Sequence, residues 1–169
     1  MKRLQEGSRA LILPLPSTYG RIDIERYAGK WLILVFYPKD FAVGCTLEAK
    51  AFQSKLNDIR ELKADVIGIS PDTLETHIRY ASELGLKYEL ASDTDGSMAG
   101  PYGVLVKSGK VKFKMGAFLI SPQGILVKSY MNGRVSLRVY EILKDLKFIE
   151  GLGDRLEIER VMVQQGLNR

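Results

Sequence analysis

Cys45 is the only cysteine of the chain and the residue best suited to nucleophilic or redox chemistry. It follows a hydrophobic run from Trp31 to Tyr37 and a segment, 38–44, that begins with a proline and ends with a glycine. This order is typical of a strand, a turn and a helix that opens at the cysteine. The N–H groups and dipole of a first helical turn can lower a thiol pKa from about 8.5 toward neutrality. We therefore expect a reactive thiolate at Cys45.

Two less reactive interpretations compete with this one. A free cysteine is often a buried apolar side chain, but the turn before Cys45 favours a functional position on a rigid sheet. The sole histidine, His77, lies in a later helical segment. We expect it to be a partly exposed structural residue, separated from Cys45 by the topology, rather than half of a Cys–His pair.

Composition predicts one globular domain within the 169 residues, which carry a net charge of +5. A single cysteine excludes an internal disulfide and CxxC chemistry. The first seven residues lack the apolar segment of a signal peptide, and the apolar runs are too short to cross a bilayer. We expect a cytoplasmic protein with no membrane segment. The lysine-rich stretch 107–114 could attract anions, but we interpret it as a solvated strand face and expect no nucleic-acid binding.

Strand and helix patterns alternate along the chain. Strands are predicted at 31–37, 64–70, 88–91 and 110–115, and a hairpin at 118–130. Helices are predicted at 45–62, from about 74 to 84 with a capping pattern at Asp72 and Glu75, and around 139–146, with a helical turn at 97–102. This order predicts an α/β fold, a thioredoxin-like three-layer sandwich with a central mixed sheet flanked by helices.

The segment 148–169 lies outside this unit in our prediction. Gly151 and Gly153 separate it from the domain at 1–147, and residues 156–163 fit neither the helical nor the strand period. We expect a C-terminal extension that is partly ordered or serves as a docking or oligomer contact.

Several motifs, in order, resemble a peroxiredoxin of the Q, or bacterioferritin-comigratory-protein, subgroup, over about residues 13–146. They are Phe36-Tyr37-Pro38-Lys39-Asp40, Gly44-Cys45-Thr46-Leu47-Glu48-Ala49, Val66-Ile67-Gly68-Ile69-Ser70-Pro71-Asp72, Ser92-Asp93-Thr94-Asp95-Gly96, Tyr102-Gly103-Val104 and Phe118-Leu119-Ile120. The resemblance implies a thioredoxin-fold thiol peroxidase in which Cys45 attacks a hydroperoxide oxygen and becomes a sulfenic acid.

The chain departs from the family pattern at three positions. Ala42 stands where the family has the threonine that hydrogen-bonds the peroxide and the thiolate, although Pro38, which shields the sulfur, is present. Met115 stands where the family has an arginine, and Lys114 beside it should face the other way. Lys50 occupies the position of the usual resolving cysteine.

These residues imply an antioxidant one-cysteine peroxidase that acts on hydrogen peroxide or organic hydroperoxides. Pro38 and Gly44 would shape the pocket, and Thr46 and Glu48 would support it. An external thiol or a thioredoxin-like protein would reduce the oxidised cysteine. We expect no cofactor or metal ion, and a monomer or homodimer. The alternative is a catalytically degenerate member that keeps the fold as a redox-sensing or binding module.

Overall fold

The structure is a computed structural model that describes residues 2–165. It has strands in a large and a small sheet, and helices that include two short 3-10 turns. The strands are β1 (Pro16–Ser17), β2 (Gly20–Arg21), β3 (Trp31–Phe36), β4 (Ala64–Ser70), β5 (Glu89–Ser92), β6 (Leu105–Ser108), β7 (Lys110–Phe113), β8 (Gly116–Ile120) and β9 (Leu126–Tyr130). The helices are η1 (Ile24–Tyr27), α1 (Val43–Ser54), α2 (Leu56–Glu61), α3 (Leu74–Leu84), α4 (Ala99–Tyr102), η2 (Val135–Leu137) and α5 (Arg138–Gln164).

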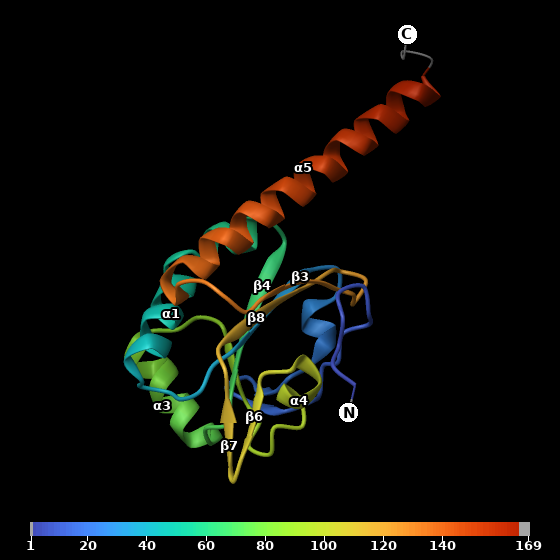
Figure 1. Ribbon diagram of the computed structural model, residues 1–169. Helices are drawn as coiled ribbons and strands as arrows, with labels where there is room; N and C mark the ends of the chain where they lie inside the picture. The colour runs from blue at the N-terminus through green and yellow to red at the C-terminus, as the bar shows by residue number, and fades with distance from the viewer. Residues whose placement is uncertain (1, 166–169) are drawn as a thin grey trace.

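The large sheet is mixed and has the order β2-β1-β5-β4-β3-β8-β9. Strand β3 lies parallel to β4 and antiparallel to β8, so both of its edges are paired. Helices α1 and α3 lie on one side of this sheet and η1 and α4 on the other (Figure 1). The predicted three-layer thioredoxin-like sandwich is therefore confirmed.

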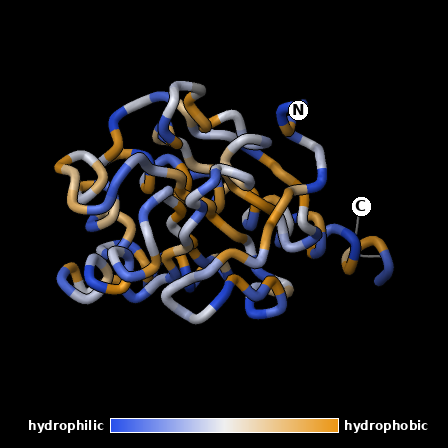
Figure 2. Tube along the Cα trace, turned by 90° about the horizontal axis from the view of Figure 1, so that it is seen from below, coloured by the Kyte–Doolittle hydropathy of each residue, from blue (hydrophilic) through white to orange (hydrophobic). Residues whose placement is uncertain are grey.

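Strand β3 divides the hydrophobic core into two clusters because its side chains alternate between faces. Ile33 and Val35 pack in the cluster that contains Cys45, whereas Leu34 and Phe36 pack in the cluster beneath η1 and α4. Every residue of β3 is buried, which explains its continuous apolar sequence. Figure 2 shows hydrophobic stretches that cross the middle of the Cα trace, with hydrophilic and some hydrophobic residues in the outer loops.

Most predicted elements are present, with two local corrections. The single helix predicted over 45–62 is wrong, because α1 and α2 are separated at Lys55. The expectation of a partly exposed His77 is also wrong: His77 and Tyr80 of α3 are fully buried, while Ile78 is 54% exposed. Gly85 ends α3 in the left-handed conformation, with φ of 63°, as its position after the helical pattern predicts.

The last helix differs most from the sequence prediction. Helix α5 continues through Gly151 and Gly153 as far as Gln164, and so includes residues 156–163, whose pattern indicated neither a helix nor a strand. Residues 166–169 of the predicted extension lie outside the described residues. In Figure 1 the C-terminal half of α5 projects away from the rest of the molecule. The division at residue 147 therefore falls inside one helix, and the functional role of the extension stays a prediction.

Within residues 2–165, no helix is long and apolar enough to cross a membrane.

Candidate active site

Cys45 lies in the first turn of α1, directly after the loop that follows β3. Its side chain is buried, with a relative exposure of 5%, and it belongs to the core cluster on the α1 face of the sheet. The predicted position at a helix start is therefore correct. The helix has no side-chain cap, because Ala42 occupies the N-cap position.

Burial raises the pKa of the Cys45 thiol, contrary to the lowered pKa that the sequence led us to expect. A backbone hydrogen bond from Lys39 opposes the effect of burial and lowers the pKa. The negative charges of Glu48, Asp40 and Asp72 add to the rise. Desolvation and nearby carboxylates thus outweigh the helix start, and the thiol form is favoured at neutral pH.

The other predicted pocket residues are brought to the same loop and helix. Pro38 and Lys39 are exposed, and Gly44 is half-buried. Thr46 places its hydroxyl 3.2 Å from the hydroxyl of Tyr80 on α3, which ties the first turn of α1 to that helix.

The two positions at which the family pattern has a threonine and an arginine both lie against the core on the α1 side of the sheet. Ala42 and Met115 are partly buried and pack against the cluster that contains Cys45. Lys114 is exposed, as strand alternation predicts. Neither Ala42 nor Met115 can donate a hydrogen bond from its side chain to a bound peroxide.

A buried polar network that the sequence analysis did not predict anchors the loop before Cys45. The hydroxyl of Tyr37 donates to Asp40 Oδ1 at 2.6 Å, and His77 Nδ1 lies 2.7 Å from Asp40 Oδ2. This second contact is close, but it is not aligned as a hydrogen bond. The backbone N–H of Asp40 donates to Asp72 Oδ2 at 2.9 Å. His77, expected to be partly exposed, is thus buried against the loop that precedes Cys45.

This network fixes a strained backbone. Phe41 has φ of 67°, a left-handed conformation that is uncommon for a bulky residue. Its ring packs against Tyr80, with centroids 4.9 Å apart, and Arg79 Cζ lies 5.2 Å from its centroid. Asp40 and Phe41 thus both contact α3, and these contacts hold the chain in the conformation that leads into Cys45.

A second unpredicted partner comes from the far end of the chain. Arg138 Nη1 at the start of α5 donates to Glu48 Oε2 at 2.9 Å and to Oε1 at 3.2 Å. Both side chains are 2% exposed. Burial raises the pKa of Glu48 to about 7, although the charge and hydrogen bond of Arg138 lower it. Glu48 lies in the second turn of α1.

Cys45 and Glu48 share a small internal cavity. Cys45 and Glu48 line it together with the rings of Tyr37 and Tyr88, and Gly68 of β4 closes its wall. A side chain at Gly68 would approach the buried Leu90 to 2.7 Å, so only glycine fits without a shift. Sequence spacing places Cys45 and Glu48 on adjacent helical turns, but only the fold supplies the aromatic walls.

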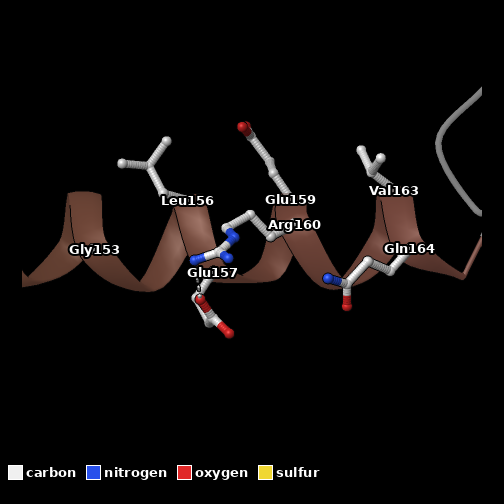
Figure 3. A pocket seen from close by; sticks show the side chains of 7 residues that line it. All are labelled: Gly153, Leu156, Glu157, Glu159, Arg160, Val163 and Gln164. Atoms are coloured by element: carbon white, nitrogen blue, oxygen red, sulfur yellow. Dashed lines mark ion pairs between the residues drawn. The ribbon is translucent and has the colours of Figure 1, made fainter.

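A second hollow lies far from this site, along the projecting part of α5. Its lining side chains, which include Leu156, Val163 and the Glu157–Arg160 ion pair, all come from that one helix (Figure 3). Because no second element encloses it, this hollow is a surface feature of the helix. The described residues contain no group of three or more His, Cys, Asp or Glu side chains that could hold a metal ion.

Comparison with known proteins gives a consistent result. The model of the AhpC/TSA family matches residues 8–129. Peroxiredoxin Bcp of Bacillus subtilis (strain 168) is 34% identical over 150 residues, which are 85% of this chain and 96% of that protein.

Solved structures of related proteins have a similar fold. A cysteine-to-serine mutant of PrxQ from Xylella fastidiosa is similar with a TM-score of 0.81 and 25% identity, over 89% of this chain and 99% of that chain. The bacterioferritin comigratory protein of Xanthomonas campestris, described for its alkyl peroxide reduction activity, has a TM-score of 0.73 and 29% identity, over 80% and 90% of the two chains.

Proposed function

The chain belongs to the AhpC/TSA family, as a thiol peroxidase of the peroxiredoxin Q or bacterioferritin-comigratory-protein subgroup, and we propose on this premise that Cys45 is its peroxidatic nucleophile. The observation that carries the proposal is the position of this single cysteine in the first turn of α1, after the anchored loop. Catalytic groups favour such turns on a rigid sheet.

The reaction that we propose needs only the thiol and a hydroperoxide. The Cys45 thiolate attacks the terminal peroxide oxygen, the O–O bond breaks, and the sulfur becomes a sulfenic acid. The leaving oxygen takes up a proton and departs as water or an alcohol. The related protein of X. campestris supports organic hydroperoxides as substrates beside hydrogen peroxide.

Reduction of the sulfenic acid requires an external thiol, because Lys50 stands at the expected resolving position. A first thiol condenses with the sulfenic acid, which releases water and leaves a mixed disulfide. A second thiol, from a small molecule or a thioredoxin-like protein, then displaces Cys45. Such reductants support action in a reducing compartment, and we propose the cytoplasm. The protein would act as a monomer or homodimer.

Within this proposal the remaining site residues shape the pocket. Pro38 shields the sulfur, Gly44 leaves the helix start open, and Thr46 fixes the first turn through Tyr80. Ala42 and Met115 leave the pocket without two family donors, so the activity is weaker than the family pattern implies.

A second candidate function follows from the same departures. The raised pKa of Cys45 and its burial favour a redox-sensing or binding module that reacts slowly with peroxide. The rate of Cys45 oxidation separates the two functions.

The test treats the full chain with dilute hydrogen peroxide in the presence of a sulfenic-acid trap and identifies the products by mass spectrometry. We expect labelling of Cys45 before oxidation of the five methionines, and no label in Cys45→Ser. If Cys45 stays reduced while methionine sulfoxide accumulates, the peroxidase proposal is wrong.

A further inference from the structure

The proposed reaction requires a proton to leave the Cys45 thiol and a proton to reach the departing peroxide oxygen. The threonine and arginine side chains of the family pattern, which could assist, are absent from this chain. The Cys45 thiol must lose a proton before the sulfur attacks, since burial raises its pKa. The departing oxygen must then gain a proton. Ala42 and Met115 carry no group that could do either.

Glu48 is placed to move this proton. It lies one helical turn after Cys45, and both side chains line the same internal cavity. Both are almost fully buried, with exposures of 2% for Glu48 and 5% for Cys45. The negative charge of Glu48 raises the pKa of Cys45, so the two groups interact electrostatically. One of them therefore holds a proton more readily when the other is ionised.

Arg138 makes such an exchange possible in a buried site. Its Nη1 contacts both oxygens of Glu48, at 3.2 Å and 2.9 Å, and compensates the carboxylate when it is ionised. Burial opposes ionisation and raises the pKa of Glu48 to about 7. A carboxyl group with a pKa near neutrality can both accept and donate a proton during turnover.

We propose that Glu48 is a catalytic residue that carries the Cys45 thiol proton to the departing oxygen of the peroxide, and that Arg138 is the positioning residue that holds it. The inference rests on the proposed function. The Glu48 carboxylate takes the proton from Cys45, and the thiolate attacks the terminal oxygen. The protonated Glu48 then gives this proton to the leaving alkoxide or hydroxide. The products are a sulfenic acid, an alcohol or water, and the original carboxylate.

Other ionisable groups face the pair and shift its titration. For Glu48 they are Arg138 on α5 and the Tyr88 ring before β5, whose pKa burial and Glu48 both raise. The groups near Cys45 are Asp40 in the loop before α1, Asp72 in the turn between β4 and α3, and Tyr80 on α3. Tyr37 also lines the cavity. Of the three carboxyl groups near Cys45, which are Asp40, Glu48 and Asp72, Glu48 is the one that lines the cavity with it.

The decisive experiment compares three electrophiles on Cys45 in the wild type and in Glu48→Gln. Hydrogen peroxide needs a proton on its leaving group, whereas iodide from iodoacetamide and acetate from peracetic acid leave without one. We expect Glu48→Gln to react with hydrogen peroxide at least roughly 100-fold more slowly at pH 7, the usual contribution of general acid–base catalysis. Iodoacetamide and peracetic acid should react at least as fast as with the wild type, because the thiol pKa falls when the Glu48 charge is removed.

Glu75→Gln is the matched control, because it removes an exposed carboxylate from α3 and should leave all three rates unchanged. Equal losses toward all three electrophiles in Glu48→Gln would mean that Glu48 only positions the cysteine. An unchanged peroxide rate would also overturn the proposal. A wild type that is alkylated but not oxidised by peroxide would instead refute the proposed function itself.

A pH profile of the wild type keeps the proposal testable if Glu48→Gln does not fold. In the form that reacts with peroxide, the pair of Cys45 and Glu48 carries one proton in total. The rate of oxidation by peroxide should therefore rise and then fall as pH increases. The iodoacetamide rate should only rise. Two profiles that rise in parallel would contradict proton transfer by Glu48.

Discussion

If Ala42 and Met115 occupy the threonine and arginine positions of the family, as we propose, they are the residues that most change the chemistry available to Cys45. A hydroxyl and a guanidinium at these positions would each stabilise the developing charge by about 1.5–4 kcal/mol. Their joint absence costs roughly two to five orders of magnitude in rate if nothing compensates. Proton transfer by Glu48 would restore part of this difference. Lys39 is an exposed cation on the turn before Cys45.

Restoring both donors tests whether the two positions form one site. We expect Ala42→Thr with Met115→Arg to lower the Cys45 pKa and to raise the peroxide rate by roughly two orders of magnitude or more. The gain should exceed the combined gains of the single variants, because neighbouring groups that act on one charge couple. Thermal melting must be recorded as well, since an unpaired buried arginine can destabilise the fold. An unchanged rate in a well-folded double variant would contradict this view, and Lys39 would be replaced next.

The titration of Glu48 also predicts a pH dependence of stability. Its pKa is raised in the folded protein from 4.5 to about 7. Between these values the folded state binds more protons than the unfolded state, so stability falls as pH rises through this window. We expect the stability of the wild type, relative to Glu48→Gln, to fall by up to about 3 kcal/mol from pH 4.5 to 7, since each pKa unit corresponds to about 1.4 kcal/mol. Urea unfolding across this range measures it, and a flat difference would contradict a buried, titrating Glu48.

At the scale of elements, the site depends on how α3 and α5 pack against α1. Helix α3 presents His77 to Asp40 in the loop before Cys45, and α5 presents Arg138 to Glu48. Each helix thus places one buried cationic or basic group against a carboxylate of the cysteine region. The contact from α3 holds the loop between β3 and α1, in which Phe41 adopts a left-handed conformation.

Weakening the contact between α3 and the loop should loosen the cysteine region. Asp40→Asn removes the charge beside His77, and we expect a loss of roughly 1–3 kcal/mol in urea unfolding, as for other buried polar groups that lose a partner. Alkylation of Cys45 should become faster, because the loop opens more readily and a charge that raises the thiol pKa is gone. Asp58→Asn, an exposed residue of α2, is the control. Unchanged stability and alkylation would show that the network does not anchor the loop.

At the scale of the whole molecule, the single buried cysteine limits the oxidised forms that can exist. With one cysteine, a disulfide requires a second molecule, and the sulfur must first become accessible through local opening of α1. Overoxidation to sulfinic acid competes, because this chain holds no thiol that could trap the sulfenic acid.

We therefore predict that peroxide-treated protein migrates on non-reducing gels as a monomer or as a Cys45–Cys45 linked dimer. An added small thiol should restore the reduced form before, but not after, sulfinic acid accumulates. Mass spectrometry of each band checks the assignment. Rapid recycling by thioredoxin without any detectable mixed disulfide would contradict this scheme.

The sequence by itself determined the layered sheet and the location of the cysteine. Strand β4 and the β8–β9 hairpin are predicted by continuous or alternating apolar residues. Burial of one face of a strand gives alternating apolar residues and burial of both faces gives a continuous apolar run, and both patterns are visible within a few residues of sequence. The turn and helix start at Cys45 follow from a proline and a glycine within a few residues. The order of several such motifs was sufficient to recognise the family.

Only the tertiary structure decided which groups surround the sulfur. Asp40 meets His77 across 37 positions of the chain (77 − 40), and Glu48 meets Arg138 across 90. The local sequence pattern predicts which face of a helix is apolar. It does not predict which polar side chain of another element will contact that helix. The raised pKa of Cys45 arises in the same way, because desolvation is a property of the packed core rather than of the helix start.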